Sequence, residues 1–131
     1  MLGKNYIGYI GSRNINNFRY PQSVQNLIIR EFANKNNFNL TLSNTEYAMQ
    51  NCFIVLNNLL KFNLKNKNGI IFFSHRIFFD NLIEIRKKLT KLIKKNKQIH
   101  FALENISIKS IKDIDNFLDI KRLDILINET N

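Results

Sequence analysis

The chain has 131 residues and a formal net charge of +10 at pH 7, and its single cysteine, Cys52, excludes an internal disulfide. No apolar run approaches the roughly 20 residues that span a bilayer, so membrane insertion is not expected. These features predict one cytoplasmic domain, residues 1–131, whose strongly basic charge makes nucleic acid a candidate partner.

The first predicted unit is a strand, a polar loop and a helix. Residues Lys4–Ser12 are apolar and β-prone, which is typical of a strand covered on both faces. Pro21 then begins a helix, because proline suits the first helical position, and the Lys35–Asn37 stretch ends it. The apolar residues of this helix recur at helical spacing and predict one buried stripe: Val24, Leu27, Ile28 and Phe32.

Two further strands flank a second predicted helix. Phe38–Leu42 alternates apolar and polar residues and predicts the second strand, while residues 43–46 have the composition of a turn and a helix cap. The helix that follows has its apolar residues on one side: Cys52, Val55, Leu56, Leu59 and Leu60. A turn at Asn66–Gly69 precedes a buried third strand at Ile70–Phe73.

The remaining predicted elements are a basic helix, one or two strands and a last helical region. The basic helix covers Phe79–Lys95 and turns its apolar residues inward: Leu82, Ile85, Leu89, Leu92 and Ile93. Ile99–Leu103 predicts the fourth strand, and Asn105–Ile108 fits a short fifth one. Ser110 caps the last helical region, which is either continuous or broken before Lys121.

This alternation of strands and helices predicts an α/β protein with a mainly parallel sheet and helices on both faces. In such sheets ligands bind beyond the carboxyl ends of the strands. The strand ends and the start of the first helix supply a polar, mixed-charge set there: Ser12, Arg13, Gln22, Gln25, Asn26, Glu46, Tyr47, Arg76 and Glu104. His75, His100 and Cys52 show no metal-ligand spacing, and neither a dinucleotide fingerprint nor a Walker A motif occurs, so no metal or cofactor is expected.

Several of these residues have two interpretations. Arg13 and Arg76 suit a phosphate or a carboxylate of a ligand, or an ion pair with Glu46 or Glu104. The two glutamates could act as an acid/base pair on a sugar, although Glu46 also stands where a first-turn acid favours the helix dipole. Ser12 is a nucleophile only if a base activates it, and otherwise a hydrogen-bonding hydroxyl.

The amide and aromatic residues complete this predicted site. Gln22, Gln25 and Asn26 suit the hydroxyl groups of a ligand, although both glutamines also fit an ordinary polar helix surface. Tyr47 could stack on the face of a sugar.

The basic helix concentrates positive charge at residues 84–97. Seven basic residues stand there against Glu84: Arg86, Lys87, Lys88, Lys91, Lys94, Lys95 and Lys97. They form either a solvated outer face or a surface that contacts a phosphate backbone.

Apolar side chains are dense around the end of the third strand, at Phe72, Phe73, Ile77, Phe78 and Phe79. Such a set could exceed what one core buries, and exposed apolar patches mark partner surfaces. It predicts a homodimer or a complex with a pathway partner protein.

Four segments resemble a family of small bacterial proteins, the sporadic carbohydrate cluster proteins. They are Gly8–Arg13, Pro21–Arg30, Ser43–Met49 and His100–Glu104. The resemblance covers nearly the whole chain and implies a role in surface-carbohydrate biosynthesis, without implying a reaction.

The chain is also distantly similar to the N-terminal catalytic domain of serine recombinases. Those domains begin with a Tyr-containing strand, a Ser loop and a helix with spaced glutamines. Their Arg two residues before the Ser corresponds to Ile10 here, and Ser74-His75-Arg76-Ile77 lacks their Asp-Arg pair. The similarity therefore implies the fold, with strands in the order 2-1-3-4, but not strand exchange.

Taken together, the residues and the resemblances predict a surface-glycan biosynthesis protein that binds a sugar, sugar phosphate or nucleotide sugar at the rim. An enzyme and a non-catalytic binding subunit both fit. A nucleic-acid-binding or resolvase-like module that uses the helix at 84–97 ranks second. The solvated outer face is the favoured interpretation of that helix, so nucleic acid is not the expected partner.

Overall fold

The computed structural model describes residues 4–12, 20–48, 52–78 and 81–130. These residues form a five-stranded sheet in the order β2-β1-β3-β4-β5, with β1 to β4 parallel and β5 antiparallel to β4. The elements in chain order are β1 (Asn5–Gly11), α1 (Gln22–Lys35), β2 (Asn39–Glu46), α2 (Ile54–Asn58), the π-helical turn η1 (Leu59–Asn63), β3 (Gly69–Phe72), the 3₁₀ turn η2 (His75–Phe78), α3 (Leu82–Lys94), β4 (Gln98–Phe101), β5 (Ile106–Ile108) and α4 (Ile111–Thr130). The predicted strand order and the short fifth strand are confirmed.

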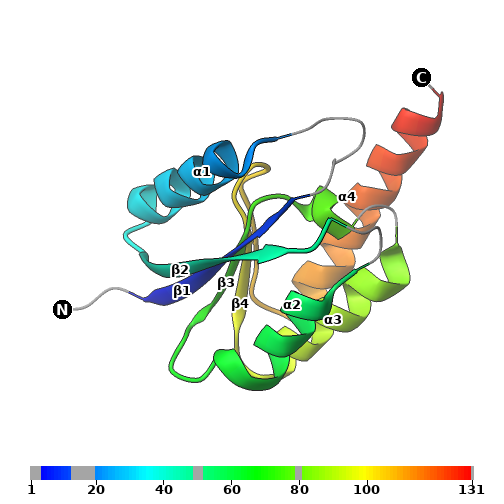
Figure 1. Cartoon of the computed structure of the whole chain (residues 1–131). Helices are drawn as coiled ribbons and strands as arrows, with labels where there is room; N and C mark the ends of the chain where they lie inside the picture. Colours follow the sequence, from blue (N-terminus) through cyan, green and yellow to red (C-terminus); the bar gives the residue numbers. More distant parts are fainter. Residues whose placement is uncertain (1–3, 13–19, 49–51, 79–80, 131) are drawn as a thin grey trace.

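The direction of the crossovers explains the three layers. The connection from β1 to β2 crosses the sheet one way, and the connections from β2 to β3 and from β3 to β4 cross it the other way. Because parallel crossovers are right-handed, α1 must cover one face while α2 and α3 cover the other. Figure 1 shows this arrangement, with α4 beside α3 on the second face.

The second strand is longer than the sequence predicts. Residues Ser43–Glu46 belong to β2 and pair in register with Gly8–Gly11 of β1, so the prediction of a turn there is wrong. Polar residues with turn propensity can continue a strand when a neighbouring strand satisfies their backbone groups.

The buried face of α1 also differs from the prediction. Val24 and Leu27 are 38% and 56% exposed, contrary to the prediction, whereas Phe32 is buried and Ile28 packs partly buried against the core, as predicted. Gln25, Ile29 and Ala33 are buried as well. The helix is therefore rotated relative to its predicted stripe. The cause is the Gln25 side chain, which hydrogen-bonds the backbone at the end of β1.

The predicted second helix consists of the short α2 and the turn η1, while Cys52, Leu56, Leu59 and Leu60 are buried as expected. The last helical region is continuous as α4, without a break before Lys121. Helix α3 begins at Leu82, where the Asn81 side chain accepts a hydrogen bond from the Glu84 amide at 3.2 Å.

Among the described residues, asparagines with positive φ lie in four turns. Asn37 follows α1, Asn66 precedes β3, Asn96 follows α3, and Asn105 connects β4 and β5. Asparagine tolerates the left-handed conformation better than other non-glycine residues. The predicted end of the first helix at Lys35–Asn37 is therefore confirmed, and so is the turn before β3, although Gly69 of the predicted turn already belongs to the strand.

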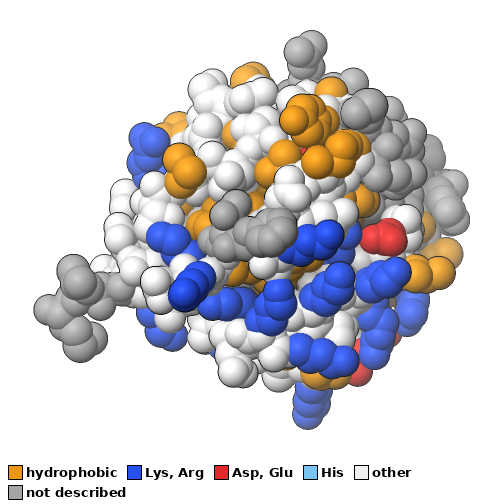
Figure 2. All heavy atoms as spheres, turned by 60° about the horizontal axis from the view of Figure 1, so that its bottom comes forward, with side chains coloured by type: hydrophobic (Ala, Val, Ile, Leu, Met, Phe, Trp, Pro, Cys, Tyr) orange, Lys and Arg blue, Asp and Glu red, His pale blue; other side chains and the backbone are white. Residues whose placement is uncertain are grey.

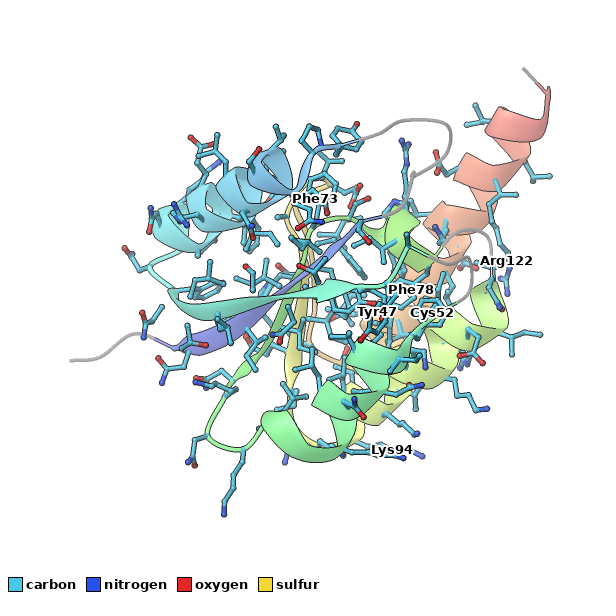
Figure 3. All side chains as sticks on the ribbon, viewed as in Figure 1. Tyr47, Cys52, Phe73, Phe78, Lys94 and Arg122 are labelled. Carbon is cyan, nitrogen blue, oxygen red and sulfur yellow. The ribbon has the colours of Figure 1, made fainter. Side chains whose placement is uncertain are left out.

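The aromatic residues around the end of β3 are part of the core. Phe72, Phe73, Ile77 and Phe78 are fully buried, and Phe79 lies outside the described residues. Phe73 contacts Tyr20 beside α1, while Phe78 stacks on Phe53 on the other side of the sheet (Figure 3). The prediction that this set forms a partner surface is wrong, because the described side chains are buried in the core on the two faces of the sheet.

Candidate functional site

The predicted rim residues separate into three places. Ser12, Gln25, Glu46 and Tyr47 lie around the ends of β1 and β2. Ser74, Arg76 and Glu104 lie beyond β3 and β4. Gln22 is exposed at the start of α1, Asn26 faces a groove, and Arg13 lies outside the described residues.

Gln25 holds two backbone segments together. Its Nε2 donates to the carbonyl oxygens of Gly11 at 2.7 Å and Tyr20 at 2.8 Å, and its Oε1 accepts from the Gly11 amide at 3.0 Å. The residue is fully buried. Its amide is therefore occupied by the chain itself, at the two ends of the connection from β1 to α1.

Glu46 anchors the start of α2. Its fully buried carboxylate accepts from the Tyr9 hydroxyl at 2.8 Å and from the amides of Val55 at 3.1 Å and Leu56 at 3.2 Å. It also accepts from the Tyr47 amide at 3.1 Å. This explains how a helix of five residues begins without a polar cap residue of its own.

Ser12 and Tyr47 lie next to this carboxylate. The Ser12 hydroxyl donates to the Glu46 carbonyl oxygen at 2.9 Å, and no side-chain base contacts it within the described part of the chain. Tyr47 is 53% exposed. The nucleophilic role of Ser12, the acid/base role of Glu46 and the stacking role of Tyr47 stay predictions.

Asn26 lines a polar groove of about 530 Å³ between α1 and the edge strand β2. Arg30 and Asn34 follow it along α1, and residues 38–43 form the other wall. The Asn26 Oδ1 atom is buried and has no hydrogen-bond partner among the described residues. The ligand-binding role predicted for Asn26 therefore concerns this groove and not the rim of the sheet.

A second cluster lies at the ends of β3 and β4. The Ser74 hydroxyl donates to Glu104 Oε2 at 2.6 Å, and the His75 amide donates to Glu104 Oε1 at 3.1 Å. Burial raises the pKa of the Glu104 carboxyl, while these hydrogen bonds and the charge of Arg76 oppose the rise. Arg76 pairs with Asp124 of α4 at 3.6 Å instead of with either predicted glutamate.

Lys121 belongs to this cluster and was not predicted. Its Nζ lies 2.9 Å from His75 Nδ1, and only 2% of the residue is exposed. Burial, followed by the charges of Lys121 and Arg76, lowers the pKa of His75 to about 3. The available signal was its spacing, because Lys121 follows the buried residues Ile114, Phe117 and Leu118 on the same stripe of α4.

His100 has a structural role inside the sheet. It lies in β4, where its Nδ1 is 2.7 Å from the Ser107 hydroxyl of β5, and its ring contacts Tyr6. Burial lowers the pKa of His100 to about 4. In the residues that the structure describes, no three His, Cys, Asp or Glu side chains are grouped so that they could hold a metal ion.

Helix α3 displays the basic residues on the face of the molecule that carries α2 and η1. Figure 2 shows Lys and Arg side chains gathered in a belt there. Arg86, Lys87, Lys91 and Lys94 are exposed and, with Ile83 and Thr90, line a shallow cavity of about 480 Å³. We call these four residues the α3 basic surface; in Figure 3 Lys94 points away from the body of the molecule.

Lys88 departs from the predicted solvated face. Only 7% of it is exposed, and its Nζ donates to Asn57 Oδ1 at 2.7 Å and lies 3.4 Å from Glu84 Oε2. A second cavity of about 420 Å³ separates α3 from α2 and η1 at this point. Asn57, Leu60 and Glu84 line it together with five lysines: Lys61, Lys87, Lys88, Lys91 and Lys95. We call it the lysine pocket.

No helix in the described residues is long and apolar enough to cross a membrane. No protein-family model matches the chain, and no curated protein does. The resemblance to the sporadic carbohydrate cluster proteins therefore receives no support.

Solved structures do match. A resolvase family site-specific recombinase from Streptococcus pneumoniae is 14% identical, with a TM-score of 0.63 over 95% of this chain and 93% of that one. The N-terminal catalytic domain of TP901-1 integrase is 11% identical, with a TM-score of 0.65 over 95% of this chain and 97% of that one. At these identities the likeness concerns the fold alone. The chain has a resolvase-like α/β fold.

Proposed function

We propose that the protein binds nucleic acid through the α3 basic surface. The observation that carries the proposal is the arrangement of Lys87, Lys91 and Lys94, which are exposed on one side of α3. Across the described ranges, none of these three lysines forms a salt bridge. Their charges are therefore available to an external anion.

A phosphate backbone fits this surface better than a single small anion does. The lysines repeat along the helix, and lysine contacts phosphates as a compact point charge without sequence preference. Arg86 is ion-paired with Asp115 of α4, but both side chains are about half exposed, so the pair contributes little and can exchange for a phosphate. The two solved structures compared above come from a site-specific recombinase and an integrase, which agrees with this ligand class.

The proposal contains no strand-exchange step. The Ser12 hydroxyl donates to a backbone carbonyl, and position 10 is isoleucine where the recombinase pattern has arginine. Sugar binding at the rim ranks behind nucleic-acid binding, because Gln25 and Glu46 are fully buried in internal hydrogen bonds. Neither residue could reach a ligand without giving up contacts that hold the backbone.

Charge reversal on α3 tests the proposal. Fluorescence anisotropy with labelled duplex and single-stranded oligonucleotides would measure affinity between about 50 and 200 mM salt. The triple variant Lys87→Glu, Lys91→Glu, Lys94→Glu should bind much more weakly. The slope of log affinity against log salt should fall by about 0.7 to 0.9 for each phosphate that the variant no longer neutralises.

The matched control changes three basic residues outside α3. Lys4→Glu, Arg30→Glu, Lys35→Glu alters the net charge by the same amount, on the residue before β1 and on α1. It should retain most of the affinity if α3 makes the contacts. Equal losses in both triple variants, or wild-type binding that does not weaken with salt, would contradict the proposal.

A further inference from the structure

We infer that the lysine pocket binds a terminal phosphate, at the end of a nucleic-acid strand or on a nucleotide. The inference rests on the proposed nucleic-acid binding and adds a second, recessed subsite to it. Lys87 and Lys91 line both the pocket and the shallow cavity of the α3 basic surface, so the two are continuous across one side of α3.

Two lysines of the pocket are held in place before any ligand arrives. Lys88 Nζ donates to Asn57 Oδ1, and it lies 5.1 Å from the centre of the Phe53 ring. Lys95 Nζ donates to the carbonyl oxygen of Leu60 in η1. These contacts tie α3 and the residue that follows it to α2 and η1, and a preformed arrangement loses less entropy when an anion binds.

The charge of the pocket is not balanced from within. Five lysines face a single carboxylate, Glu84, which already lies beside Lys88. In the segments that the structure describes, Lys61, Lys87 and Lys91 have no salt-bridge partner. This excess of positive charge favours a ligand that carries more than one negative charge in a small volume.

A phosphate monoester meets that requirement better than a phosphodiester. It carries about −1.5 to −2 charges at pH 7 and three terminal oxygens, since its second pKa is near 6. A backbone diester carries one charge and is flanked by sugars on both sides. Among nucleic-acid ligands, a strand end or a free nucleotide can place a monoester inside a recess of about 420 Å³ between two helical segments, whereas an internal phosphate of the strand is a diester.

The first experiment compares strand ends. Single-stranded oligonucleotides of one sequence, labelled at the 3′ end, would carry either a 5′-phosphate or a 5′-hydroxyl. We expect the phosphorylated strand to bind roughly tenfold more tightly at pH 7.5, as for one added charge-assisted contact. This preference should shrink at pH 5.5, because the monoester then loses its second charge.

Two single variants test whether the preference for the 5′-phosphorylated strand arises in the lysine pocket. Lys61→Gln removes a lysine that lines only the pocket, and Lys94→Gln removes one that lines only the shallow cavity. Both side chains are exposed, so neither variant should disturb folding. Lys61→Gln should abolish most of the 5′-phosphate preference, whereas Lys94→Gln should weaken both oligonucleotides equally and leave their ratio unchanged.

Titrations with nucleotides distinguish the two ligands that carry a terminal phosphate, a strand end and a free nucleotide. Adenosine 5′-monophosphate and adenosine 5′-triphosphate would be titrated against the wild type and Lys61→Gln by calorimetry. Nucleotide binding that is present in the wild type and lost in Lys61→Gln supports the pocket, with a nucleotide as its ligand. This conclusion holds even if no oligonucleotide binds and the proposed function is wrong. Equal, salt-dependent binding of both oligonucleotides without any nucleotide binding overturns the pocket and leaves the proposed function standing.

Discussion

At the scale of single residues, Gln25 is the clearest case of a polar side chain that stabilises the fold. It satisfies both backbone groups of Gly11 and the carbonyl of Tyr20. These two residues flank the connection between β1 and α1, so one side chain fixes where the connection leaves the sheet and where it rejoins the helix.

Replacing Gln25 with alanine should lower the free energy of unfolding by about 2 to 4 kcal/mol, because buried backbone groups would lose their partners. Urea unfolding at equilibrium measures the change. Gln22→Ala is the matched control, since it removes an exposed glutamine from the same helix and should cost less than about 0.5 kcal/mol. Similar costs for both variants would contradict the role assigned to Gln25.

The two buried histidines make stability depend on pH. Burial lowers the pKa of His75 to about 3 and that of His100 to about 4, from an ordinary value of 6.5. The unfolded chain therefore takes up protons that the folded chain refuses as pH falls below 6.5. Between pH 7 and pH 5 each histidine should remove up to about 2 kcal/mol from the free energy of unfolding.

Urea unfolding at pH 7 and pH 5 checks this expectation. Glu104 acts in the opposite direction, because its raised pKa gives stability that is present below its ordinary pKa and is lost as pH rises. The variant His100→Gln should lose part of the pH dependence while it can still hydrogen-bond Ser107. A wild type that is equally stable at both pH values would contradict the burial of uncharged imidazoles.

At the scale of elements, α1 shows that the apolar periodicity of a helix does not by itself decide which of its faces is buried. Its observed inward positions are Gln25, Ile29, Phe32 and Ala33, a helical repeat that begins with a polar residue. The sequence alone offers a more apolar repeat through Val24 and Leu27. The hydrogen bonds of Gln25 select the observed face, and the two apolar residues remain exposed.

A pair of alanine substitutions distinguishes the two faces of α1. Ile29→Ala should cost about 2 to 5 kcal/mol, since the side chain is fully buried against the sheet. Leu27→Ala should change the free energy of unfolding by less than about 0.5 kcal/mol, as expected for an exposed position in a helix. Chemical denaturation measures the free energy of unfolding of both variants. A larger loss in Leu27→Ala than in Ile29→Ala would contradict the observed buried face and support the predicted stripe.

At the scale of the whole molecule, α4 carries a group of exposed apolar residues. The apolar contacts of this helix with the domain come from its first half, through Ile114, Phe117 and Leu118, and Lys121 continues the buried side. The second half extends past the sheet (Figure 1) and exposes Ile120, Leu123 and Leu126 by 56% or more. This surface, rather than the aromatic residues near β3, now supports the prediction of a homodimer.

Sedimentation velocity over a range of concentrations would test the dimer. The wild type should associate, and Ile120→Lys, Leu123→Lys should stay monomeric without loss of stability, because both positions are exposed. Lys109→Gln, Lys112→Gln on and before the start of α4 serves as the control and should associate like the wild type. A wild type that remains monomeric at the highest concentration would rule the dimer out.

The sequence by itself determined the elements and their order. Apolar runs bounded by turn residues marked β1, β3 and β4, the alternation with helices implied a parallel sheet, and asparagines such as Asn37 and Asn66 marked the turns. These features are local, because strand and helix periods and left-handed turn conformations are properties of short segments. The concentration of positive charge in α3 was visible for the same reason.

Only the tertiary structure decided which polar residues are buried. Gln25 meets Gly11, Glu46 meets Val55 and Leu56, Lys88 meets Asn57, and Lys121 meets His75, 46 positions away. A polar side chain enters a core where it finds partners, and those partners come from segments that only folding brings together. For that reason the sequence indicated a ligand-binding rim where the structure has internal hydrogen bonds, and missed the pocket between α3 and η1.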